Sequence, residues 1–102
     1  ESESDVVRKA RGAAWRQYGY ALFYVGDFPK SLDAADRARV IFEQCAVSDY
    51  DLARVGIVRA LTLTALERTD EALSVADESA RVFGEGASLV EAAVDDVRVT
   101  RE

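Results

Sequence analysis

The chain lacks histidine altogether, and among its 102 residues it has one cysteine and one proline. The absence of histidine removes the commonest general base and the commonest metal ligand. Cys45 has no second thiol to pair with, so no internal disulfide forms. We expect it to be a half-buried thiol at a helix end rather than a nucleophile. These absences predict that the chain is not an enzyme and needs no metal or cofactor.

Other common signatures are missing as well. No apolar run approaches the roughly 20 residues that span a bilayer, so no membrane partner is expected. The spacing of Gly84 and Gly86 suits a turn rather than a phosphate-binding loop. Asp33 and Asp36 are expected to be solvated helical charges, not a cation site. A lone cysteine fits a reducing compartment, so the expected location is the cytoplasm.

The negative charge is concentrated in the last third of the chain. Residues 1–68 hold ten acidic and ten basic side chains, whereas residues 69–102 hold nine acidic and three basic ones. This imbalance accounts for the whole net charge of −6. A sequence-independent phosphate binder needs the opposite sign, so no nucleic-acid partner is expected. The acidic third is interpreted as a solvated helix face that aids solubility.

The remaining composition favours helix. The chain is 49% hydrophobic and 31% charged, so it can bury a core, and alternating β patterns are absent. Short breaks in the apolar pattern leave links of about two to five residues, which make neighbouring helices antiparallel. The sequence therefore predicts an all-α domain with five helical segments, over residues 5–25, 28–45, 50–67, 70–83 and 88–101.

Each predicted helix start after the first has a residue suited to capping. A side-chain oxygen at this position accepts a hydrogen bond from a free backbone N–H of the first turn. Pro29 in the first turn of the second helix costs little, because that N–H is unpaired anyway. The predicted caps are Asp27, Ser48 or Asp49, Thr69, and Ser88 with Glu91 as a capping box.

Apolar residues recur at helical intervals of three and four. In the first helix this spacing predicts a core-facing stripe of Trp15, Tyr18, Leu22 and Val25. The fourth helix continues the pattern with Leu73, and the last helix carries Val90, Val94 and Val97.

The sequence repeats itself at a shift of 41 residues. The matched pairs are Gly19 with Ala60, Leu22 with Leu63, Ser31 with Ala72, Leu32 with Leu73, Ala35 with Ala76, Ala38 with Ser79, and Phe42 with Phe83. An internal period of this size is typical of solenoids built from helix pairs. Small residues at Gly19 and Ser31, and again at Ala60 and Ala72, predict two places where consecutive helices cross closely.

The stretch WRQYGYALFYVGDFPKSLDAADRA resembles a tetratricopeptide repeat. Trp15, Gly19, Leu22, the Gly26-Asp27-Phe28 turn and Ser31-Leu32 follow that family's order of bulky, small and turn residues. A second copy, RALTLTALERTDEALSVADESARVF, extends the resemblance to residues 14–83. The long period is similar to that of repeats in bacterial regulators and signalling ATPases.

The resemblance implies an antiparallel helix-pair solenoid within a single domain, residues 1–102. Repeat 1 would cover residues 5–45 and repeat 2 residues 50–83, with residues 88–101 as an extra or capping helix. The chain begins without methionine, so we expect it to be a piece of a longer protein.

This chain also departs from the family pattern. Gly56 stands where Trp15 stands in the first copy, and Ala35 and Ala76 replace a usually large residue. The customary proline after the second helix is absent. The period exceeds the family's usual length of about 34 residues.

Six of the nine aromatic residues lie between positions 15 and 28. Trp15, Tyr18 and Phe28 are interpreted mainly as core, whereas Tyr20 and Tyr24 lie one turn apart on a different face. In the repeat family the first helix of each pair lines a concave groove. The resemblance therefore implies a partner-binding groove formed by Arg16, Tyr20, Phe23, Tyr24, Arg54, Ile57 and Leu61.

Aromatic residues and arginine are enriched at binding hot spots, which favours a protein-interaction module that holds a peptide or helix of a partner protein. The alternative is an accessory or ligand-sensing domain of a multidomain bacterial regulator or signalling enzyme. Apolar end-helix faces also predict a homodimer, either through Tyr20, Phe23 and Tyr24 or through the last helix.

Overall fold

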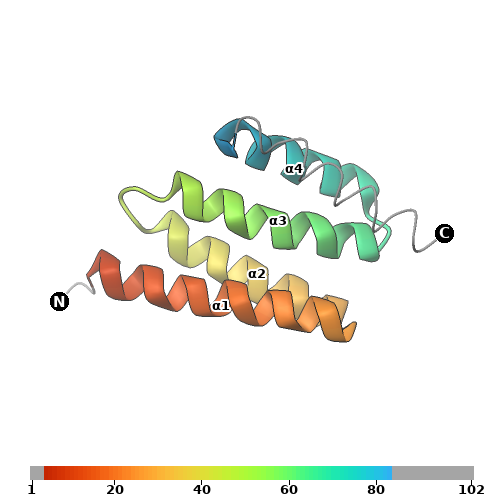
Figure 1. Cartoon of the computed structure of the whole chain (residues 1–102), viewed down its shortest axis with the longest axis horizontal. Helices are drawn as coiled ribbons and strands as arrows, with labels where there is room; N and C mark the ends of the chain where they lie inside the picture. The colour runs from red at the N-terminus through yellow and green to blue at the C-terminus, as the bar shows by residue number, and fades with distance from the viewer. Residues whose placement is uncertain (1–3, 84–102) are drawn as a thin grey trace.

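The computed structural model describes residues 4–83 as four α-helices without a strand, which confirms the all-helical prediction. The helices are α1 (Asp5–Val25), α2 (Phe28–Glu43), α3 (Asp49–Ala65) and α4 (Thr69–Phe83). Consecutive helices run antiparallel, with α3 lying against α2 and also touching α1 (Figure 1). The predicted fifth helix, over residues 88–101, lies outside the described residues.

The helix starts follow the predicted chemistry in part. Asp27 caps α2 by accepting a hydrogen bond from the Lys30 backbone N–H at 3.3 Å. Ser48 precedes α3 but makes no side-chain capping bond. The prediction that Thr69 caps α4 is wrong, because Thr69 is already inside the helix. The residue before it is Arg68, whose carbonyl accepts from Ala72 at 3.0 Å.

Both helix pairs turn through the same backbone motif. At the end of α1, Gly26 has φ of 87°, and Asp27 N–H donates to the Leu22 carbonyl at 3.0 Å. At the end of α3, Glu67 has φ of 64°, and Arg68 N–H donates to the Leu63 carbonyl at 2.8 Å. These are Schellman-type ends with a left-handed residue, and they lie 41 residues apart. The internal repeat therefore extends to the turns.

Small residues let the helices approach one another. At Gly19 an added Cβ would lie 3.2 Å from the Ser31 carbonyl oxygen, so a larger side chain there would force α1 and α2 apart. Ala60 and Ala72 are fully buried in the corresponding place between α3 and α4. Gly12 likewise leaves room for the Phe42 ring, because a Cβ added at Gly12 would lie 2.8 Å from the ring carbon Cζ.

The predicted core stripe of α1 is wrong in two places. Tyr18 is 52% exposed and Val25 is 76% exposed. The residues of α1 that are fully buried are Gly12 and Gly19, where the helix backbone comes close to its neighbours. The larger Trp15 and Tyr20 are partly buried and pack against the core of α2 and α3. In α4, Leu73 likewise lies at the surface, 38% exposed.

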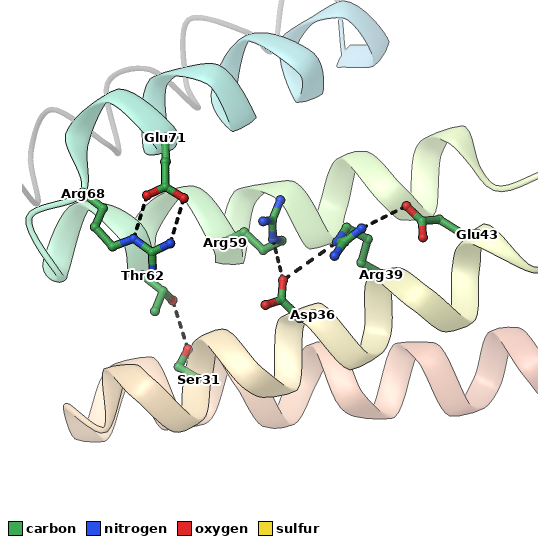
Figure 2. A network of polar contacts seen from close by, with 8 residues as sticks. All are labelled: Ser31, Asp36, Arg39, Glu43, Arg59, Thr62, Arg68 and Glu71. Carbon is green, nitrogen blue, oxygen red and sulfur yellow. Dashed lines mark hydrogen bonds and ion pairs between the residues drawn. The ribbon is translucent and has the colours of Figure 1, made fainter.

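Polar side chains join α2 to α3 (Figure 2). The Ser31 hydroxyl donates to the Gly19 carbonyl at 2.7 Å and lies 3.0 Å from the Thr62 hydroxyl, so it links α1, α2 and α3. Farther along, Asp36 accepts a hydrogen bond from Arg59 at 2.9 Å. These contacts fix which faces of α2 and α3 meet, because buried hydroxyls must keep their partners.

Candidate functional site

Two arginines from different helix pairs meet on the side where α1 touches α3. Burial and the nearby Arg54 guanidinium lower the pKa of Arg16, while Asp51 and Tyr50 act in the opposite direction. Arg54 also lies over the Tyr50 ring, 5.8 Å from its centroid. The structure thus brings together both basic residues that were predicted to line the groove.

A lysine offsets the acidic side chain beside these two arginines, so the surface keeps their positive charge. Lys9 of α1 lies 3.4 Å from the Asp51 carboxylate and offsets its charge. Lys9, Arg16 and Arg54 against Asp51 leave two positive charges in a chain whose net charge is −6. A carboxylate placed here would relieve the repulsion between Arg16 and Arg54. We name these four residues the basic patch.

Aromatic rings continue the same helix beyond Arg16. Tyr20 and Tyr24 stack edge to face with centroids 4.9 Å apart, and their hydroxyls lie 3.2 Å apart. This hydrogen bond, with partial burial, raises the pKa of Tyr20 above its usual value. The Phe23 ring packs on the Tyr24 and Phe28 rings, with centroid distances of 5.6 Å and 5.7 Å. Tyr24 is 70% exposed, so it is the ring most available to a partner.

The two aliphatic members of the predicted groove differ in exposure. Ile57 is half-buried and packs against the core formed by Ala60, Leu63, Ala72 and Ala76. Leu61 is only 7% exposed, so it belongs to the core and offers little contact area to a partner.

Sequence reasoning missed Lys9, Tyr50 and Asp51 as neighbours of this surface. Their position one or two turns before Arg16 and Arg54 on the same helices carries the signal, since residues three, four or seven apart share a helix face. Tyr50 also meets Phe83 of α4 edge to face at 5.5 Å. This contact links the start of α3 to the end of α4.

Metal ligands and the single thiol are further candidate groups. Within residues 4–83 no three acidic or cysteine side chains come together as a metal site. Cys45 is 8% exposed, and its thiol donates to the Ile41 carbonyl at 3.6 Å. None of the four described helices is both long enough and apolar enough to cross a bilayer.

Comparison with known proteins finds no family model, curated protein or solved structure that matches this chain.

Proposed function

We propose that the chain is a protein-interaction module of the helix-pair solenoid type, similar to tetratricopeptide repeats. The observation that carries the proposal is the basic patch, which holds two neighbouring guanidinium groups beside a row of aromatic rings. Its ligand is a segment of a partner protein with a carboxylate for Arg16 and Arg54 and an apolar side chain for Tyr24. The module itself performs no reaction and needs no cofactor, and it works in the cytoplasm.

The surface is suited to binding a peptide segment rather than to enclosing a small ligand. The basic patch and the aromatic rings lie along one helix, with Arg16 one turn before Tyr20 and Tyr20 one turn before Tyr24. An extended or helical peptide can follow such a line, and buried aromatic and arginine anchors supply most of the energy at interfaces of this kind.

A peptide array tests the proposal. We expect the chain to select peptides that combine acidic and apolar residues, and the selected peptide is then titrated by fluorescence anisotropy. Reversing both charges with Arg16→Glu and Arg54→Glu should abolish binding. Arg81→Glu, an exposed change on α4, should leave it unchanged. Equal binding by the charge-reversed variant would refute the basic patch as the site.

A further inference from the structure

A second hollow lies away from the basic patch, between α2, α3 and α4. It is a pocket of about 230 Å³. Gly56 and Ser79 line it together with apolar side chains and with charged side chains of both signs. The apolar ones are Leu52, Ala53, Val55, Val75 and Val82, and the charged ones are Arg39, Arg59, Glu43, Asp49 and Glu78.

The internal repeat shows what fills this space in the first helix pair. At a shift of 41 residues, Gly56 corresponds to Trp15. The pocket residues Leu52, Val55, Arg59, Glu78 and Val82 correspond to Arg11, Ala14, Tyr18, Arg37 and Ile41. Those five residues line the two shallow hollows on either side of Trp15. The pocket is therefore the place that an indole ring occupies in the first pair.

The first and second helix pairs differ both at this position and at the residue that faces it. Trp15 corresponds to Gly56, and the buried Ala38 corresponds to Ser79. A Cβ at Gly56 would collide with the Ser79 hydroxyl, so glycine is the residue that this serine permits. Ser79 is only 3% exposed. Arg39 Nε, on another lining residue of the pocket, is buried and has no hydrogen-bond partner among the described residues. A buried polar group left without a partner is costly and marks a place where a ligand can bond.

We propose that this pocket binds one planar aromatic ring of indole size, in the position equivalent to that of Trp15. The volume suits a bicyclic ring, because an apolar cavity of about 150 Å³ already accepts benzene. In the first pair the Arg37 guanidinium lies 5.0 Å from the Trp15 ring centroid. In the pocket Arg39 and Arg59 supply the cations for the ring face, and Ser79 or Glu78 accepts the ring N–H.

None of the residues that line the pocket is aromatic, so the proposed ring is supplied from outside the lining. The source is either a free aromatic compound or an aromatic side chain of a bound protein, and both present the same ring to the pocket.

The test is a titration of the ¹⁵N-labelled chain with indole and, separately, with N-acetyl-tryptophanamide. We expect saturable shifts centred on the Gly56 and Ser79 amides at millimolar ligand or below. Shifts with both compounds indicate that the pocket admits a peptide-borne side chain, and shifts with indole alone indicate a free compound. Absence of shifts with either compound, or shifts centred on other residues, overturns the proposal.

A second measurement uses variants that place the residues of the first helix pair in the pocket. Gly56→Trp combined with Ser79→Ala fills the pocket from within and should weaken indole binding at least about tenfold. Ser79→Ala alone leaves the space open and should retain binding. Gln17→Trp adds the same ring on an exposed part of α1 and should change nothing. Circular dichroism verifies that each variant is helical, and unchanged indole binding by a folded double variant refutes the site.

Discussion

At the scale of single residues, the two helix-pair turns place different residue types in the same left-handed backbone conformation. Gly26 adopts positive φ without steric cost, whereas the Cβ of Glu67 crowds the backbone in the same conformation. The second turn therefore stores strain that the first does not. This difference leads to a prediction for each turn.

Glu67→Gly should raise the free energy of unfolding by about 1 kcal/mol, because glycine removes the Cβ contact at positive φ. Gly26→Ala should lower it by a similar amount, since it introduces the same contact into the first turn. Urea denaturation followed by circular dichroism measures both. A Glu67→Gly variant no more stable than the parent would show that the turn is relaxed.

The close helix crossings make a second residue-scale prediction. Gly19→Leu and Ala60→Leu should each lower the free energy of unfolding by about 1–3 kcal/mol through overpacking. Ala21→Leu is the matched control, because Ala21 is exposed on α1. It should change stability by no more than about 0.5 kcal/mol. Thermal melts that do not distinguish the three variants would contradict the crossing geometry.

At the scale of helices, Ser31 holds the α1–α2 pair to α3 through two hydrogen bonds in a fully buried position. Ser31→Ala fits sterically, since Ala72 occupies the equivalent place in the second pair. It leaves the buried Thr62 hydroxyl without this partner, and should cost about 1–3 kcal/mol.

A double-mutant cycle with Thr62→Val isolates the contact between α2 and α3. The double variant should lose less stability than the sum of the two single variants, because each single change already removes the contact between Ser31 and Thr62. Strict additivity in urea denaturation would show that the two hydroxyls are independent.

Helix existence and type followed from apolar periodicity and capping chemistry, and four of the five predicted segments lie in the described residues as helices. The exact ends did not follow: Arg68 rather than Thr69 precedes α4, because the Arg68 carbonyl already accepts a hydrogen bond from Ala72. Periodicity also failed for Tyr18 and Val25. It identifies one face of a helix, but it cannot show how deeply each residue of that face lies, and in α1 the fully buried positions are Gly12 and Gly19.

The candidate site was predictable to a similar degree. Arg16 and Arg54 were identified because residue type and helix position both indicated one face. Leu61 was expected in the groove, yet it lies almost entirely inside, since a spacing of one turn does not fix how deeply a helix is embedded. The 41-residue match between Trp15 and Gly56 was visible in the sequence. That the glycine opens a pocket against Ser79 required the packing of α3 on α4.

At the scale of the whole molecule, charge and exposed rings together predict how copies of the chain meet. Tyr24 is 70% exposed and packs on Tyr20 and Phe23, which makes an aromatic patch at the end of α1. Exposed apolar patches of this kind tend to pair. The nine acidic and three basic residues after position 68 oppose the meeting of two C-terminal ends. The expected product is a dimer joined through α1.

Sedimentation should therefore show dimers at a protein concentration of about 100 μM, near the range in which weak protein pairs form. Tyr20→Glu with Tyr24→Glu should give monomers, because each buried interface would then contain unpaired carboxylates. Tyr18→Glu changes another exposed ring of α1, on a different side of the helix, and should leave the dimer intact. Dimers that persist with Tyr20→Glu and Tyr24→Glu but dissociate with Tyr18→Glu would place the interface on the Trp15 side instead. In that case the aromatic patch would remain available to the partner peptide in every copy.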